Sequence, residues 1–426
     1  NNDLERGTEF NASFKLIEMC LMWAGLFSGK YDRYIPYNIY RVVVMGLFAF
    51  LYILCVLINI FLVRGLDTIL NYLSVGLNLQ TTMLKAATVF ILRYNFFELS
   101  KLVTEMDKRL IEQEDKERLR KVIRQCKRIV LIYFTLYLSV IIMFTVNSLI
   151  TRKHLPVAVW MPFDWKSSNL KFAVAQIYLF TCSFSQVLQC CTYDSFPTVY
   201  MKVLSGHMKA LINHVQKIEK NPTKNSNNNY SDLVSCIEYH QEILKYLDII
   251  KPIISWVYLY QLVSTTVVLC LSTSYILLYS NGFIDVLTAF FYLSAVILQS
   301  LPTCFFVDQF MNDSNWLTTA IYNCNWIDKD MKFKRSIIIF MLRTQISNTI
   351  LAGKLVPVSL VTFLGVCYFI LNRYKVYRTT LYRSFISDGQ VFIFSICDSK
   401  SNEGLILEII QHSSNICTFL KSYTFL

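Results

Sequence analysis

Six stretches of about 20 or more mostly apolar residues recur along this 426-residue chain, and they limit its possible folds more than any other feature. A helix of about 20 apolar residues crosses the hydrocarbon core of a bilayer, so each stretch predicts a membrane span. Composition agrees, because 16% of the residues are charged, against roughly 25% in soluble proteins. The six stretches are Val42–Val63, Ile69–Leu92, Ile129–Ile150, Phe172–Phe196, Ile253–Tyr279 and Ile284–Val307, and a shorter seventh is Leu355–Leu371. The sequence therefore predicts an all-α, polytopic membrane protein with seven transmembrane helices.

The basic residues are distributed unevenly between these stretches. Segments 1–41, 93–128, 197–252 and 308–335 together contain 27 Lys and Arg, whereas the three alternate segments contain five. Because cytoplasmic loops are enriched in basic residues, the amino terminus is predicted to be cytoplasmic. The net charge of +12 is then loop charge, and no nucleic-acid partner is expected.

The predicted cytoplasmic segments have helical periodicity. Residues 99–130 show mixed charges at i,i+4 spacing and should prolong the second and third spans as helices. Two amphipathic pieces, 200–218 and 230–250, follow the fourth span and are separated by an Asn-rich polar turn.

Single polar residues, such as Lys85 and Asp194, interrupt the predicted spans. The favoured interpretation of Lys85 is that its long side chain reaches out to the membrane interface. The alternative is a place in a water-filled cavity or pore.

Motifs for catalysis or metal binding are missing from the sequence. His207 and His214 share a helix face without a third ligand at metal spacing, so a solvated helix surface is the favoured interpretation. Glu112 and Glu114 likewise fit a solvated face. No P-loop, GxGxxG or GxSxG motif is present. We expect no enzyme activity, cofactor or metal site.

The most informative region follows the sixth span. Its ordered set of residues resembles the insect odorant receptor family over about 60 positions. The residues that carry the resemblance are Cys304, Ser314, Ala320-Ile321-Tyr322, Trp326, Lys334-Arg335-Ser336, Met341, Arg343, Gln345, Ala352-Gly353-Lys354, Pro357 and Phe363.

This resemblance implies the tuning subunit of an odorant-gated, non-selective cation channel. It implies a hetero-tetramer with a shared odorant co-receptor, a small volatile ligand and contact with membrane lipid, in the plasma membrane of olfactory neurons. Residues 1–307 would form the membrane bundle, 308–354 a cytoplasmic anchor and 355–371 the pore helix. The anchor, or subunit contact, would include Tyr322, Trp326, Phe333 and Arg343.

The pore helix is expected to begin near Pro357, because Pro in a first helical turn sacrifices no hydrogen bond. A pore lined by Val and Leu can gate by dewetting. The expected pore residues are Pro357, Val358, Val361 and Leu364. The odorant pocket of the family lies in the outer half of the membrane, and depth alone selects Tyr72, Phe144, Phe180 and Tyr292 here.

The resemblance stops after Val366, and Arg373 and Lys375 follow the seventh stretch closely. Segment 372–426 is then either a genuine external loop or, as we favour, an aberrant translation. Three other functions stay open: a gustatory-type receptor of the same superfamily, a secondary transporter, or a G-protein-coupled receptor. This chain lacks the internal repeats that a secondary transporter predicts. It also lacks the orientation and the motifs of a G-protein-coupled receptor.

Overall fold

The computed structural model describes most of the chain between residues 35 and 368. The described residues are 22, 35–43, 51–62, 66–110, 112–151, 155–157, 159–220, 226–279, 283–324, 326–327 and 329–368. Segment 372–426, with the predicted anomalous tail, lies outside them. The elements are α2 (Ile35–Val43), α3 (Leu51–Leu62), α4 (Leu66–Ile91), α5 (Arg93–Lys108), α6 (Gln113–Thr151), α7 (Asn169–Lys220), α8 (Ser226–Tyr279), α9 (Phe283–Asn323), α10 (Met331–Thr344), β1 (Leu351–Ala352) and β2 (Val356–Pro357). A last helix follows at 360–368, so helices and the loops between them make up the described chain apart from one short hairpin.

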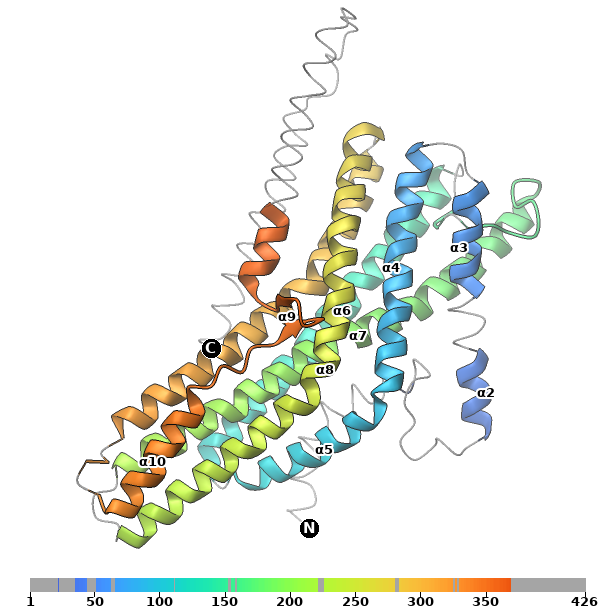
Figure 1. Ribbon diagram of the computed structural model, residues 1–426. Coiled ribbons are helices and arrows are strands. Elements are labelled where there is room, and N and C mark those ends of the chain that lie inside the picture. Colours follow the sequence, from blue (N-terminus) through green and yellow to red (C-terminus); the bar gives the residue numbers. More distant parts are fainter. Residues whose placement is uncertain are drawn as a thin grey trace, which may run out of the picture.

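Four helices are much longer than a membrane span. They are α6 with 39 residues, α7 with 52, α8 with 54 and α9 with 41. At 1.5 Å per residue, α8 extends about 80 Å, against about 30 Å for the hydrocarbon core. The predicted amphipathic pieces 200–218 and 230–250 are therefore the continuations of apolar spans. Figure 1 shows these helices running together toward the end of the molecule that carries α10.

The second predicted span bends where its apolar stretch ends. Helices α4 and α5 meet at 64° around Leu92. The Asn95 side chain donates from Nδ2 to the Ile249 carbonyl oxygen of α8 at 3.3 Å. The helical prolongation of this span is confirmed, but it turns sideways along the bundle (Figure 1).

Aromatic side chains fill the core where α5, α7 and α8 meet. Phe96 packs edge-on against Phe196, with ring centroids 5.6 Å apart, and against Tyr200 at 5.9 Å. Tyr200 and Tyr246 lie 6.4 Å apart. All four side chains are buried. Edge-to-face pairs of this kind contribute about 0.5–1.5 kcal/mol each beyond area burial, so the core fixes the sideways course of α5.

Three described helices are long and apolar enough to cross a membrane, and a fourth span is possible if the bent α4–α5 pair counts as one. They coincide with the third, fifth, sixth and second predicted spans. Several apolar side chains on the bundle surface are exposed, among them Leu131 at 60% and Ile177 at 69%. A lipid environment explains such side chains.

The seventh predicted span begins later than expected. Pro357 belongs to β2, paired with Leu351 of β1, and the last helix starts at 360. Ser359 caps that helix, since its Oγ accepts from the Thr362 amide at 3.1 Å. The expectation that Pro357 occupies the first helical turn is therefore wrong.

The hairpin before the last helix turns tightly. The Leu355 amide donates to the Ala352 carbonyl oxygen at 2.9 Å, and the two residues between them, Gly353 and Lys354, have φ of +55° and +61°. Positive φ at both central positions is what a type I′ turn requires, and glycine adopts it most readily.

Candidate functional site

Two of the four predicted odorant-pocket residues lie against each other. The rings of Phe144 on α6 and Tyr292 on α9 are edge-to-face, with centroids 6.1 Å apart. Tyr292 also donates from its hydroxyl to the Ser74 carbonyl oxygen of α4 at 3.2 Å. Three helices thus meet around one aromatic pair with a polar edge.

The other two predicted residues are placed differently. Phe180 lies on α7 with 39% of its surface exposed. Tyr72 belongs to α4, but its side chain lies outside the described part of the structure. Their roles in ligand contact stay predictions.

A stripe of polar side chains on α4 continues inward from the aromatic pair. Ser74, Thr81, Thr82 and Lys85 repeat at helical spacing and are at most 5% exposed. Thr82 lies 3.2 Å from the Cys190 sulfur of α7. This face of α4 is therefore directed into the bundle and away from lipid.

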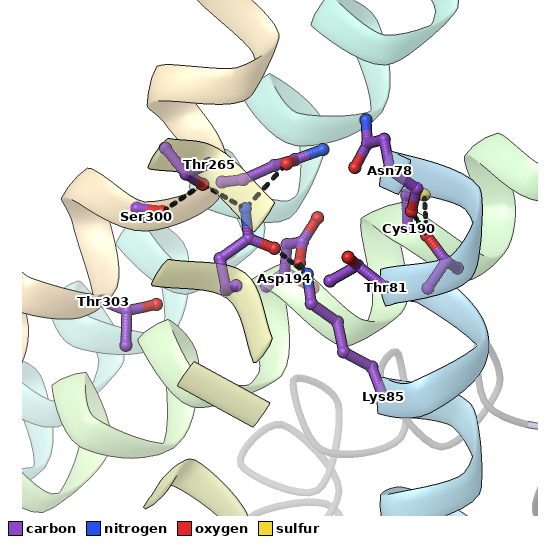
Figure 2. Close-up of polar contacts among 12 residues, drawn as sticks. Asn78, Thr81, Lys85, Cys190, Asp194, Thr265, Ser300 and Thr303 are labelled. Carbon is purple, nitrogen blue, oxygen red and sulfur yellow. Dashed lines mark hydrogen bonds and ion pairs between the residues drawn. The ribbon is translucent and has the colours of Figure 1, made fainter. Parts of the chain in front are cut away.

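Lys85 ends this stripe in a buried ion pair. Its Nζ lies 2.5 Å from Asp194 Oδ1, and both side chains are at most 3% exposed (Figure 2). Lys85 also donates to Gln261 Oε1, and Tyr137 donates to Asp194 Oδ2 at 2.8 Å. The favoured interpretation, that Lys85 reaches the interface, is wrong, because Asp194 neutralises the ammonium inside the bundle.

The polar contacts extend from Gln261 of α8 to α9. Gln261 Nε2 donates to Thr265 Oγ1 and to Gln299 Oε1, both at 2.8 Å. Thr265 Oγ1 lies 3.1 Å from Ser300 Oγ. Figure 2 draws this contact as a dashed line. We call Lys85, Asp194, Tyr137, Gln261 and Gln299 the polar cluster. It joins α4, α6, α7, α8 and α9, and satisfied buried networks of this kind hold packed helices in one register.

The start of the last helix is held by α9. The Leu360 amide donates to Asp308 Oδ2 at 2.7 Å. A carboxylate at this position accepts a hydrogen bond from an otherwise unpaired amide and interacts favourably with the positive end of the helix dipole. The position of the last helix is thus tied directly to α9.

The hairpin before the last helix is held by α8. Ser255 donates from Oγ to the Leu351 carbonyl oxygen at 2.6 Å, and the Gly353 amide donates to the Ser255 carbonyl oxygen at 3.1 Å. Figure 1 shows the hairpin lying between the long helices and the last helix.

The four predicted pore residues divide into two pairs. Val361 is 79% exposed and Leu364 40%, and their i,i+3 spacing puts them on one face of the last helix. Pro357 and Val358 precede the helix, and Val358 is buried at 3%. The exposed face of the last helix therefore begins at Val361.

The four predicted anchor residues lie at the end of the molecule that carries α10. Phe333 is buried at 3%, whereas Tyr322 is 67% exposed. Trp326 donates from Nε1 to the Tyr322 carbonyl oxygen at 3.3 Å, and Arg343 is exposed. Ile339 and Leu342 of α10 are also more than 60% exposed. An exposed apolar face of this kind is typical of an interaction surface.

A family model described as "7tm Odorant receptor" matches residues 65–370, which is more than half of the chain. The chain belongs to the odorant receptor family. The match includes the polar cluster, the hairpin and the last helix.

The relatives of this odorant receptor are insect proteins, so the resemblance inferred from the sequence is confirmed. Odorant receptor 59b of Drosophila melanogaster is 26% identical over 72% of this chain and 77% of its own length. Odorant receptor 42a of the same fly is 25% identical, over 70% and 74%. The family is one of receptors, not of enzymes, and its apolar helices make the chain a multi-pass membrane protein.

Two solved structures have the same fold. The insect olfactory receptor OR5 from Machilis hrabei has a TM-score of 0.75 at 17% identity, covering 85% of this chain and 97% of that one. The same receptor in complex with eugenol has a TM-score of 0.66, covering 88% and 99%.

The solvated-surface interpretation is wrong for His207, whereas the His214 side chain keeps 22% of its surface exposed. His207 is fully buried, with Nδ1 hydrogen-bonded to the Tyr239 hydroxyl at 2.8 Å and Nε2 3.6 Å from Asp107 Oδ1. His214 Nε2 lies 2.9 Å from Asp115 Oδ2. No group of three or more metal-ligating side chains occurs among the described residues. Burial lowers the pKa of His207 to about 3 and raises that of Asp107 to about 8.

We expect the pH dependence of stability to reveal this pair once either member is replaced. In His207→Gln, stability should fall as the pH rises from 3.8 to about 8, because the folded protein holds the Asp107 proton more tightly. In Asp107→Asn, stability should fall as the pH drops from 6.5 to about 3, because unfolded His207 binds a proton that the folded form rejects. Each slope approaches about 1.4 kcal/mol per pH unit.

In the unmodified receptor the contributions of these two residues oppose each other between pH 3.8 and 6.5, so the profiles of the two variants should depart from the unmodified profile in opposite directions there. Thermal unfolding of the detergent-solubilised receptor from pH 4 to 8 measures all three profiles. Identical profiles for the two variants would contradict the assignment.

Proposed function

We propose that this chain is the ligand-binding, tuning subunit of an odorant-gated, non-selective cation channel that works with a shared co-receptor. The carrying observation is that one helix, α9, holds both Tyr292 and Asp308. Tyr292 belongs to the aromatic pair, and Asp308 holds the start of the last helix. The two residues are 16 positions apart, or about 24 Å along a helix.

The mechanism is a shift of population between a closed and an open arrangement. A small volatile ligand that binds better to one arrangement favours it by the difference in affinity. The proposed contacts are Tyr72, Phe144, Phe180 and Tyr292, and the eugenol complex of OR5, which has the same fold, supports a site for a small organic molecule. A displacement of α9 would move the last helix through Asp308. The pore segment lined by Val361 and Leu364 would then lose its water in the closed arrangement and fill with water in the open one.

The proposed topology has seven spans, from the apolar stretches, and a cytoplasmic amino terminus, from the distribution of basic residues. The plasma-membrane location and the division into 1–307 as membrane bundle, 308–354 as anchor, 355–371 as seventh span and 372–426 as a separate tail follow the resemblance to the family. The exposed apolar face of α10 supports contact with other subunits through the anchor.

Co-expression with an insect odorant co-receptor tests the function. We expect a panel of volatiles to evoke cation currents that persist when G-protein signalling is blocked. Currents evoked only by soluble tastants would favour the gustatory-type alternative. Uptake of a solute without channel currents would favour a transporter. Normal surface expression without any current would contradict the proposal.

Removal of the Asp308 carboxylate is predicted to uncouple the last helix from α9. Loss of a helix cap costs about 1–2 kcal/mol, which is roughly a 5–30-fold change in an equilibrium. We therefore expect Asp308→Ala to raise the half-maximal odorant concentration by about that factor, measured as concentration–response curves.

Two variants control this experiment. Asp308→Asn keeps an acceptor oxygen for the Leu360 amide and should retain most of the response. Asp248→Ala removes an exposed carboxylate of α8 and should behave as the unmodified chain. An unchanged response in Asp308→Ala would contradict the role of this contact.

A further inference from the structure

Three basic residues form one exposed face of α6. Arg124, Lys127 and Arg128 follow i,i+3,i+4 spacing, and all three are exposed. We call them the basic face. The opposite side of the same stretch is buried in the bundle, with Ile123 at 6%, Cys126 at 1% and Val130 at 8% exposure. The basic face is therefore directed away from the protein.

The charges of the basic face are not neutralised within the described part of the chain. No residue at three or four positions from any of them on α6 is acidic. No carboxylate of a described residue lies within 4.0 Å, the limit for an ion pair, of any of these three side chains. Arg118 on the same helix, by contrast, pairs with Glu114 at 2.6 Å. Like charges at i,i+3 and i,i+4 cost about 0.2–0.5 kcal/mol per pair. An external anion would remove that cost.

The basic face lies at the start of a predicted span. Arg128 directly precedes Ile129, where the apolar stretch begins, and Arg124 is about 6 Å farther along the helix. Above it on the same outward side come exposed apolar residues, Leu131 at 60% and Ile132 at 53%. The headgroup layer of each leaflet is about 5–8 Å deep. Charge and apolar surface thus change over where headgroups meet acyl chains.

We propose that the basic face of α6 binds anionic phospholipid headgroups of the cytoplasmic leaflet. This inference rests on the proposed topology, which puts this end of α6 in the cytoplasm. Each basic residue near an anionic membrane surface contributes about 1 kcal/mol of attraction, and the two Arg guanidinium groups can each bind a phosphate through two hydrogen bonds. Bound headgroups would fix the depth of α6, which carries Phe144 and Tyr137.

Lipid binding can be measured on the purified full chain without odorant or co-receptor, so failure of this inference and failure of the proposed channel function are distinguishable. Dioctanoyl phosphatidylinositol 4,5-bisphosphate is titrated in neutral detergent and binding is followed by native mass spectrometry. We expect R124Q/K127Q/R128Q to bind it at least tenfold more weakly. At about 1 kcal/mol per residue, or roughly fivefold each, the loss approaches about 100-fold.

The matched control is K332Q/K334Q/R335Q, which removes the same charge from α10, and it should bind as the unmodified chain does. Equal unfolding temperatures of the two variants show that folding is intact. Equal lipid affinity of the two variants would overturn the proposal. Binding of dioctanoyl phosphatidylcholine as tight as that of the anionic lipid would do so too. So would tighter binding of free inositol trisphosphate, or of an acidic peptide, than of the lipid.

Discussion

Replacement of Lys85 by Met is expected to destabilise the receptor by about 3–5 kcal/mol. The change leaves the Asp194 carboxylate buried without its cation, and removal of one partner of a buried pair is costly because the remaining charge stays desolvated. We expect a markedly lower unfolding temperature in detergent and a large loss of surface expression.

Two further variants separate the ion pair from its surroundings. The double variant K85M/D194L removes both charges and should recover most of the loss, although Tyr137 and Gln261 each lose a partner. Lys101→Met, on an exposed position of α5, should have little effect. A double variant as unstable as Lys85→Met would show that the stabilisation does not come from charge pairing.

A methyl group at position 353 is predicted to disrupt the hairpin that leads into the last helix. Gly353 has φ of +55°, and a Cβ there would lie 2.5 Å from Leu259 Cδ2. The backbone conformation costs a non-glycine residue about 1–3 kcal/mol, and overpacking adds about 1–3 kcal/mol. Gly353→Ala should therefore lower both thermal stability and the maximal odorant current.

The chain offers matched controls for this change. L259A/G353A removes the overlap and should recover the packing part of the loss but not the backbone part. Gly365→Ala lies in the last helix with no neighbouring atom within 4 Å and should be neutral or stabilising by up to about 1 kcal/mol. If Gly353→Ala were as stable as Gly365→Ala, the strain at position 353 would be refuted.

The positions of the long helices could be predicted from the sequence, whereas the partners of their polar residues could not. Lys85 and Asp194 are visible in the sequence as interruptions of apolar stretches, but they are 109 residues apart. A buried charge inside a membrane span needs a partner, and that argument could have joined them. Gln261 and Gln299 carried the same signal within the fifth and sixth spans and were missed.

The start of the pore helix was misplaced for a related reason. Pro357 is compatible with a first helical turn and also with the edge of a hairpin, so local preference does not separate the two. The contacts that decide are distant ones. Ser255 holds β1 and Asp308 holds the Leu360 amide.

The sequence by itself determined that this chain is built of apolar helices with basic segments between them, and its motif near the end determined the family. These properties are local, because in a membrane each helix must satisfy its own backbone hydrogen bonds over a fixed length. The tertiary structure alone decided that Lys85 faces Asp194, that His207 is buried, and that the last helix begins at 360. Each of these depends on which helix face meets which neighbour, and helix periodicity leaves that choice to the packing of the whole bundle.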